Sequence, residues 1–209
     1  MQSVLHPILT FLYPPQCYHC QLPQESHQHL LCKDCLGLLQ LSNVKLGRIA
    51  TAFELDGPGA SLLHRLRKKG SEHIAEALAS FLLMRWDSLK WPMPDMITYV
   101  PSPWLRCLDR GFTPSLLLAK YTSRLFDRPL YSLLHSNYHL AQVNLSHARR
   151  KELPLNCFSL KKNQNLQGKV ILLIDDLIGT RTTMNQCIEA LSSGFPKAVY
   201  GLTVCGAID

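Results

Sequence analysis

The chain has 209 residues, of which 46% are hydrophobic, and it carries a formal net charge of +7. This length allows one full hydrophobic core plus a small appendage. No stretch approaches 18 uninterrupted apolar residues, which excludes an ordinary transmembrane helix. The positive charge favours an anionic partner, whether a phosphorylated metabolite, a nucleic acid or a membrane surface, and does not choose among them.

The N-terminal segment, residues 1–13, is apolar and is predicted to form a short amphipathic helix that ends at Pro14 and Pro15. It has no basic region before its apolar residues and no cleavage site of small residues, so it lacks the pattern of a signal peptide. A cytoplasmic location is therefore expected. The sequence does not indicate an oligomeric state.

Four of the eight cysteines form two Cys-x-x-Cys pairs with a polar loop between them. This pattern is typical of a zinc ribbon, in which each pair supplies two thiolates to one tetrahedral Zn²⁺. The alternatives are two disulfides or four free thiols. The zinc is expected to be structural, because so small a module cannot bury enough surface to fold without it. The predicted ligands are Cys17, Cys20, Cys32 and Cys35.

The remaining metal-binding side chains have a plainer interpretation. Four thiolates complete the zinc shell, so the nearby histidines, His19, His27 and His29, are expected at the surface. The other four cysteines are scattered among apolar or mixed residues and are expected to be ordinary buried thiols. They are Cys107, Cys157, Cys187 and Cys205.

Beyond the cysteines, strand-like and helix-like segments alternate. This alternation indicates an α/β domain with a mostly parallel sheet flanked by helices. We therefore expect two parts: an N-terminal helix with the cysteine module, residues 1–45, and the α/β domain, residues 46–209. Strands are predicted over residues 49–54, 96–100, 129–134, 154–160, 170–174 and 198–204, and helices over 62–69, 72–86, 113–126 and 184–191.

A polar, cationic loop follows the strand predicted over residues 96–100. Its Arg106 and Arg110 are four residues apart and would face the same way on one helical turn. Together with Ser102 they could bind a diphosphate through charge-assisted hydrogen bonds. Two arginines in a loop are more often simply solvated, and the place directly after a strand is what favours binding.

The most informative stretch is residues 170–184. An apolar run rich in β-branched residues predicts a strand buried on both faces, and Asp175 and Asp176 follow it. The next residues open a helix, where backbone N–H groups and hydroxyls can bind a phosphate. Carboxylates beside such a site suit ribose hydroxyls, directly or through Mg²⁺. The loop residues are Gly179, Thr180, Arg181, Thr182 and Thr183.

This stretch resembles the signature with which type I phosphoribosyltransferases bind 5-phosphoribosyl-1-pyrophosphate (PRPP). The match covers residues 171–176, Thr180, Thr183 and Met184, whereas Arg181 stands where the family usually has glycine. Glycine there tolerates positive φ and lets the backbone approach the 5′-phosphate. An arginine at this position would be strained by positive φ, although its guanidinium could itself bind a phosphate.

The cysteine pairs followed by this signature resemble the ComF/ComFC family, phosphoribosyltransferase-like proteins linked to DNA uptake in bacterial competence. The resemblance spans nearly the whole chain. Thr113, Leu153 and Arg181 depart from the family pattern. Residues 67–70 match a family element loosely. The matching landmarks are Val100 and Pro101, residues 110–112, Ser115, Gln142, Leu145, Ser146, Ala148, Arg150 and Phe158.

The resemblance implies binding of PRPP, or a related phosphorylated ribose, with Mg²⁺. The 5′-phosphate would lie at residues 179–183, the ribose hydroxyls at Asp175 and Asp176, and the pyrophosphate near Ser102, Arg106 and Arg110. Arg150 lies in a polar segment, residues 139–151, that reads either as a lid or as an exposed linker. The reaction would transfer the phosphoribosyl group to an acceptor that the sequence does not identify.

A second function is also compatible with the sequence. In it the chain is a non-catalytic module that binds single-stranded DNA or competence proteins. The charge of +7, the basic segment 65–69, the cysteine module and Arg181 favour it. A regulator that senses PRPP would share the pocket without the catalysis.

Overall fold

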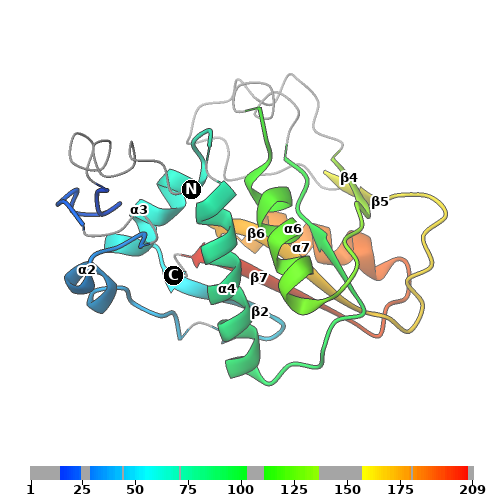
Figure 1. Ribbon diagram of the computed structural model, residues 1–209. Coiled ribbons are helices and arrows are strands. Elements are labelled where there is room, and N and C mark those ends of the chain that lie inside the picture. Colours follow the sequence, from blue (N-terminus) through cyan, green and yellow to red (C-terminus); the bar gives the residue numbers. More distant parts are fainter. Residues whose placement is uncertain are drawn as a thin grey trace, which may run out of the picture.

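The computed structural model describes residues 15–24, 29–43, 45–70, 72–102, 111–136, 157–179 and 181–206. The helix predicted over residues 1–13 and the polar segment 139–151 lie outside these ranges, as do Arg106, Arg110 and Thr180. In the described ranges, helices cover both faces of a central sheet (Figure 1). None of these helices combines the length and apolarity needed to cross a bilayer.

The central sheet has five strands in the order β1-β2-β7-β6-β3. The β1–β2 pair is antiparallel and the other three pairs are parallel, so the predicted, mostly parallel sheet is confirmed. A separate antiparallel pair, β4 and β5, forms a small second sheet. The strands are β1 (Lys45–Leu46), β2 (Ile49–Glu54), β3 (Met96–Tyr99), β4 (Leu134–Ser136), β5 (Phe158–Leu160), β6 (Val170–Ile178) and β7 (Ala198–Gly206).

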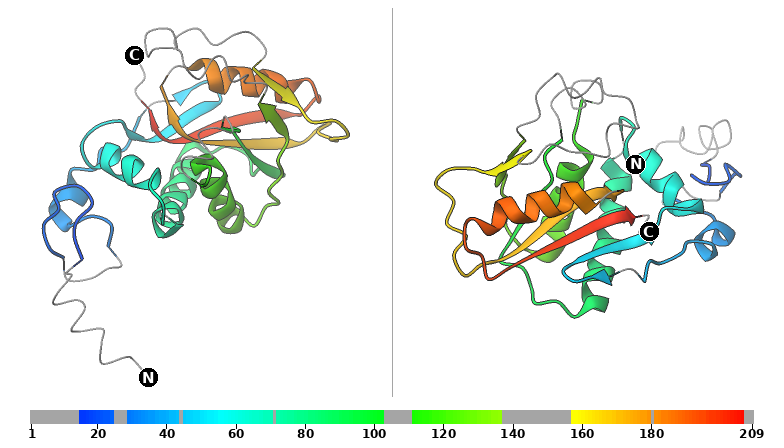
Figure 2. Two further views of the ribbon diagram at one scale, coloured as in Figure 1. Left: turned by 90° about the horizontal axis from the view of Figure 1, so that it is seen from above. Right: turned by 180° about the vertical axis from the view of Figure 1, so that it is seen from behind.

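Alternating residues of β6 fill the cores on the two faces of the sheet. Leu172 and Ile174 pack in one cluster with residues of three helices, α3 (Gly57–Leu66), α4 (Glu72–Leu89) and α6 (Pro114–Phe126). Ile171 and Leu173 pack in the other cluster with β4, β5 and α7 (Arg181–Ser192). This is the burial expected of a strand covered on both sides, and Figure 2 shows α7 on the face opposite α4 and α6.

Local sequence explains where α3 begins. Asp56 is its N-cap and accepts a hydrogen bond from the Gly57 backbone N–H at 2.7 Å. Pro58 fits the first turn, where a missing N–H is harmless. The prediction placed this helix at residues 62–69, but it spans Gly57–Leu66, so Arg67 is its C-cap residue.

Strand β6 is longer than predicted. The expected strand ended at Ile174, but β6 continues to Ile178, because β7 keeps pairing with it as far as Ile178↔Gly206. On its other side the pairing with β3 stops at Tyr99↔Ile174. The acidic pair therefore lies inside a strand that has lost one neighbour, at the carboxyl edge of the sheet.

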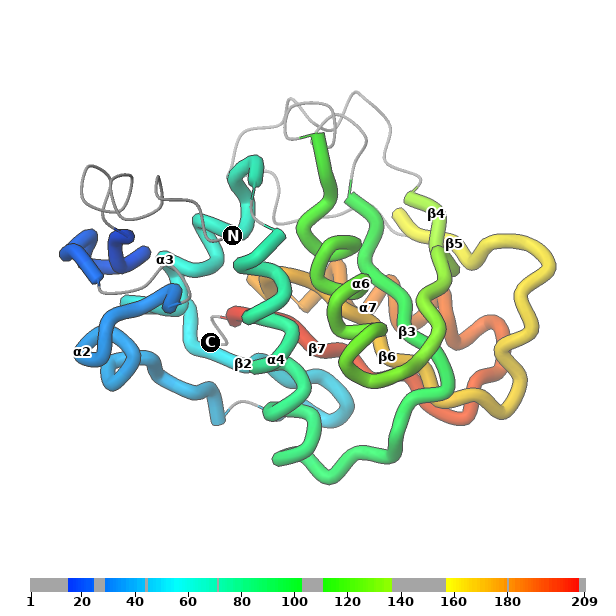
Figure 3. The backbone as a smooth tube through the Cα atoms, in the orientation of Figure 1, coloured from blue at the N-terminus to red at the C-terminus, as the bar shows by residue number. Residues whose placement is uncertain are grey.

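The cysteine module lies at one end of the sheet, beside α3 (Figure 3). It contains the short helix α2 (Lys33–Gly37). Cys17 and Cys35 belong to the same hydrophobic cluster as Leu62 and Leu66 of α3, so the module packs against the core of the larger part. The division of the chain between residues 45 and 46 stays a prediction.

Candidate functional site

The four predicted zinc ligands come together. The Sγ atoms of Cys17, Cys20, Cys32 and Cys35 all lie within 4.8 Å of one another. The Cys20–Cys32 Sγ–Sγ distance is 3.8 Å, the edge expected of a tetrahedron whose Zn–S bonds are about 2.3 Å. A disulfide needs about 2.05 Å, and all four cysteines are free. The disulfide alternative is therefore wrong, and the cluster could bind a metal.

Tight turns build this cluster. The Cys17 N–H donates to the Leu22 carbonyl and the Gln21 N–H to the Cys17 carbonyl, each at 3.0 Å. Gln21 takes the left-handed conformation, with φ of 63°, to close the first turn. In the second turn the Cys35 N–H donates to the Cys32 Sγ at 3.5 Å. Backbone N–H groups of this kind stabilise thiolate charge.

The electrostatics of the cluster suit a cation. Although burial opposes it, hydrogen bonds from the backbone of Cys32, His19 and Cys20 lower the pKa of Cys17 to about 6. Burial, followed by the neighbouring thiols, raises the pKa of Cys35 to about 12. Four thiolates would repel one another without a metal, and soft thiolates select zinc among the common divalent ions.

Side chains of the module contact the helices beside it. The Tyr18 hydroxyl hydrogen-bonds with the His73 Nε2 at 2.8 Å, and the Arg65 guanidinium lies over the Tyr18 ring at 5.0 Å. The His19 Nδ1 hydrogen-bonds with the Ser61 Oγ at 2.9 Å. His19 is half-buried, so the expectation of a surface residue was wrong for it, whereas His29 is exposed. Arg65 and Ser61 belong to α3, so two of these contacts connect the cysteine module to that helix.

The acidic pair is divided between the two faces of the sheet. Asp176 follows Ile174 on the face of α3, and Asp175 follows Leu173 on the face of α7, because side chains alternate along a strand. The charge of Asp176 raises the pKa of Cys205 to about 12, second to burial. The charge of Asp175 acts in the same way on Cys187, a residue of α7.

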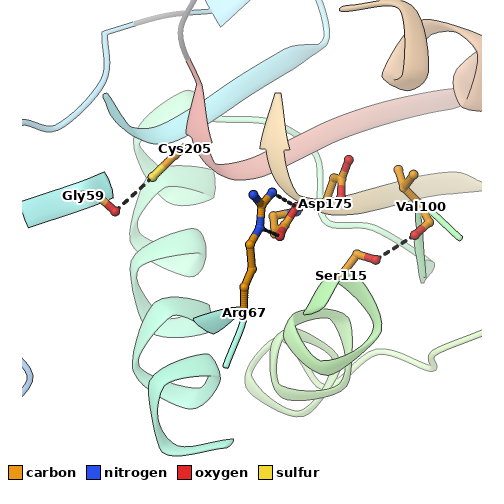
Figure 4. A network of polar contacts seen from close by, with 7 residues as sticks. Gly59, Arg67, Val100, Ser115, Asp175 and Cys205 are labelled. Carbon is orange, nitrogen blue, oxygen red and sulfur yellow. Dashed lines mark hydrogen bonds and ion pairs between the residues drawn. The ribbon is translucent and has the colours of Figure 1, made fainter. Parts of the chain in front are cut away.

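Arg67 binds Asp176 with two hydrogen bonds. Its Nε donates to Oδ2 at 2.6 Å and its Nη2 donates to Oδ1 at 3.1 Å. The side chains are 32% and 12% exposed. Figure 4 shows the guanidinium pointing at the acidic segment of β6, next to Asp175. Burial alone would lower the pKa of Arg67, but the hydrogen bond and charge of Asp176 raise it, so the pair is ionic.

Asp175 has a different environment. Its Oδ1 accepts a hydrogen bond from the Asp176 backbone N–H at 2.8 Å. Burial, and then the charge of Asp176, raises the pKa of Asp175 well above its usual range. The two carboxylates are thus unequal: Asp176 is paired with an arginine, whereas the pKa of Asp175 is raised by burial and by the charge of Asp176.

The segment after β6 opens a helix, as the sequence predicted. Gly179 is exposed, and α7 begins at Arg181, so Thr182 and Thr183 are half-buried in its first turn. The N-terminus of a helix therefore follows the acidic strand, as an anion site requires. Arg181 is not among the residues with positive φ. The expectation that arginine is strained here was wrong.

The second predicted loop begins at the same edge of the sheet. The Val100 N–H donates to the Ile174 carbonyl at 3.0 Å, which places the start of this loop beside the acidic pair. Ser102 is half-buried two residues further on. At the far end of the loop, a Cβ built on Gly111 would lie 4.0 Å from the Lys69 Cε. The basic turn after α3 thus meets both Asp176 and this loop.

Arg67 is the residue whose role the sequence did not predict. Residues 65–69 were recognised as a basic segment and residues 67–70 as a family landmark, but nothing in the sequence pairs Arg67 with a carboxylate 109 positions away. A cavity of about 410 Å³ is also present, but it lies where β2 and β7 begin, at the opposite edge of the sheet. Its lining includes Arg48, Ile188 and Phe195.

Comparison with known proteins shows only distant similarity. No family model matches the chain, and no curated protein matches it. Among solved structures, an allosteric regulatory enzyme of purine biosynthesis is 16% identical with a TM-score of 0.46, over 68% of this chain and 30% of that one. This chain thus spans less than a third of that enzyme's length.

Two further solved structures are similar at the same level. A purine phosphoribosyltransferase from Pyrococcus horikoshii OT3 is 15% identical with a TM-score of 0.42, over 64% of this chain and 82% of that one. A hypoxanthine phosphoribosyltransferase from Trypanosoma cruzi is 11% identical with a TM-score of 0.39, over 69% and 66%. All these scores lie below 0.5, so the function proposed below rests on the residues of this chain.

Proposed function

We propose that the protein binds PRPP, or a related phosphorylated ribose, with Mg²⁺ at the carboxyl edge of β6. One observation carries the proposal: the acidic pair, Gly179 and the first turn of α7 follow one another there, beside the start of a second polar loop. Ligands of open α/β sheets bind at this edge. The charge of +7 suits a ligand with several phosphates.

The residues would divide the ligand among them. Backbone N–H groups and hydroxyls at residues 179–183 would bind the 5′-phosphate. Asp176 would accept a hydrogen bond from a ribose hydroxyl through the lone pairs that Arg67 leaves free, because each carboxylate oxygen can accept two. Asp175 would receive the second hydroxyl. Ser102, Arg106 and Arg110 would bind the pyrophosphate.

The reaction that fits these groups is displacement of pyrophosphate at the anomeric carbon by an acceptor. Arg106 and Arg110 would stabilise the leaving charge, and the carboxylates would stabilise a cationic ribosyl centre. Mg²⁺, when bound with the ligand, would supply a further positive charge to the pyrophosphate oxygens. The resemblance to the ComF/ComFC family supports this activity and a link to DNA uptake.

Calorimetry with PRPP and Mg²⁺ on the zinc-loaded protein tests the proposal. Heat of binding is expected from the wild type and is expected to be lost when Asp175→Asn and Asp176→Asn are combined. The control is Asp127→Asn, an exposed aspartate in a left-handed C-cap that asparagine also tolerates. No heat with the wild type, or equal affinity after the double substitution, would overturn the proposal.

We also propose that the cysteine cluster holds one structural Zn²⁺. The single Cys20–Cys32 edge of 3.8 Å and the four convergent thiols support this. Reduced thiols are typical of the cytoplasm, which supports the expected location. Metal analysis of the purified protein is expected to give about one zinc per chain, and less than half a zinc under reducing conditions would contradict the site.

A second candidate function is binding of single-stranded DNA. Lys68 and Lys69 are exposed directly after α3, whose Arg65 contacts Tyr18 of the cysteine module, and their charges favour contact with phosphates. A gel-shift series over salt concentration tests it. Retardation at low salt that is weakened by Lys68→Gln with Lys69→Gln would support it, whereas no retardation at low salt would exclude it.

A further inference from the structure

The contact between Arg67 and Asp176 occupies both oxygens of one carboxylate. The Nε–Oδ2 and Nη2–Oδ1 distances are 2.6 and 3.1 Å. On the neighbouring residue, the Asp175 Oδ1 already accepts from the Asp176 N–H. Three of the four oxygens of the acidic pair therefore have partners within the chain.

The guanidinium is delivered by a fixed scaffold. Arg67 is the C-cap of α3, and its own N–H donates to the Leu63 carbonyl at 3.3 Å. The preceding residue, Leu66, is completely buried. At the other end of the helix, Gly59 packs so closely on β2 that an added Cβ would lie 2.7 Å from the Glu54 carbonyl oxygen. These contacts oppose a shift of α3 as a whole that would carry Arg67 away from Asp176.

The Arg67–Asp176 contact affects the binding of a divalent cation and of a ribose hydroxyl differently. Mg²⁺ needs near-octahedral oxygen ligands and would have to take the carboxylate oxygens from the guanidinium, against its positive charge. A hydroxyl is a neutral donor and can add to a carboxylate oxygen that already accepts one hydrogen bond. The same contact thus opposes one ligand and tolerates the other.

We propose that Arg67 reserves Asp176 for a ligand hydroxyl and keeps free divalent cations off the acidic pair, so that Mg²⁺ enters only together with the phosphorylated ligand. Arg67 is then a specificity-determining residue. The part about the ligand rests on the proposed function, whereas the exclusion of the free cation depends only on the Arg67–Asp176 contact.

Electron paramagnetic resonance of free Mn²⁺ on zinc-loaded protein, without PRPP, tests the exclusion. Wild type and Asp176→Asn are expected to bind Mn²⁺ equally weakly. Arg67→Gln is expected to bind it about tenfold more tightly or better, since a positive charge next to the carboxylate is removed. Arg67→Gln combined with Asp176→Asn is expected to lose that gain. The conservative variant Arg67→Lys keeps the charge and is expected to resemble the wild type.

Two results would overturn the proposal. One is Mn²⁺ binding to the wild type that Asp176→Asn weakens, a comparison that needs no substitution at Arg67. The other is a folded Arg67→Gln protein with no tighter Mn²⁺ binding than the wild type. Adding PRPP to the wild type separates the two proposals: absence of PRPP binding defeats the proposed function, while the Mn²⁺ comparison still decides the role of Arg67.

Discussion

The cysteine cluster and the acidic pair differ in how the chain assembles them. All four cysteines lie within residues 17–35, and two tight turns bring their Sγ atoms within 4.8 Å of one another. The acidic pair is also local, but its ionic partner, Arg67, comes from 109 positions away. Short-range geometry thus fixes the chemistry of the cluster, whereas the packing of α3 on the sheet fixes the chemistry of the pair.

The largest effect is expected from breaking the local site. Cys35→Ser removes a buried member of the cluster, and because metal binding is coupled to folding, the free energy of unfolding should fall by about 3 kcal/mol or more. Zinc content measured by metal analysis should fall with it. The control, Cys187→Ser, changes an equally buried thiol outside the cluster and should leave the zinc content unchanged.

This prediction would fail if Cys35→Ser kept one zinc per chain. It would also fail if both serine variants lost the metal to the same extent, since the loss would then reflect a general loosening of the fold. Chemical unfolding of both proteins, with and without a chelator, separates these cases. Only Cys35→Ser is expected to become insensitive to the chelator.

The next largest effect is expected from disturbing the packing of α3, the helix that positions Arg67. Gly59→Ala puts a Cβ 2.7 Å from the backbone oxygen of Glu54 and 3.3 Å from the Phe53 Cβ, so α3 must move off β2. We expect a loss of about 2 kcal/mol of stability, within the range for overpacked sites. Urea unfolding measures it. Gly37→Ala is the matched control, because a Cβ there meets nothing within 4 Å.

The sequence predicted the sheet that carries the acidic site better than it predicted the details of the site. The apolar runs of β2, β3, β6 and β7 and the alternation with helices predicted the parallel sheet, because strands buried on both faces have a distinct composition. The predicted end of β6 was wrong, since the length of this strand depends on how far β7 continues beside it. The sequence of a strand does not by itself determine how far a neighbouring strand pairs with it.

The same distinction holds for single residues. The Cys-x-x-Cys spacing specified the cluster, because the turns that build it are only a few residues long. The partner of Arg67 could not be predicted, since it depends on the long-range packing of α3. Arg181 was expected to be strained, but α7 begins one turn earlier than predicted and gives it an ordinary helical backbone.

A smaller effect is expected from removing the long-range partner alone. Arg67→Ala leaves Asp176, whose side chain is only 12% exposed, without its ionic partner. The cost should be about 1–3 kcal/mol, as for other polar groups that lose a partner on burial. Urea unfolding at neutral pH measures it. Arg124→Ala, an exposed cation over Tyr121, should cost about 0.5 kcal/mol or less and serves as control. Equal costs for the two variants would contradict a special role for the Arg67–Asp176 pair.

The smallest effect concerns Asp175, whose pKa is raised by burial and then by the charge of Asp176. An acid with a raised pKa holds its proton in the folded state after the unfolded chain has lost it at about pH 4. The stability it contributes is therefore fully present below that pH and is lost as the pH rises through the folded value. Asp175→Asn carries no such penalty, and its Oδ1 can still accept the Asp176 N–H.

The stability of the variant relative to the wild type should therefore rise as the pH increases from about 4 toward neutral. Unfolding by urea at several pH values measures the difference between the two proteins. Asp127→Asn, at the exposed C-cap of α6, is the control substitution measured alongside it. A difference for Asp175→Asn that is flat, or that shrinks toward neutral pH, would mean that Asp175 is ionised in the folded protein as readily as in the unfolded chain.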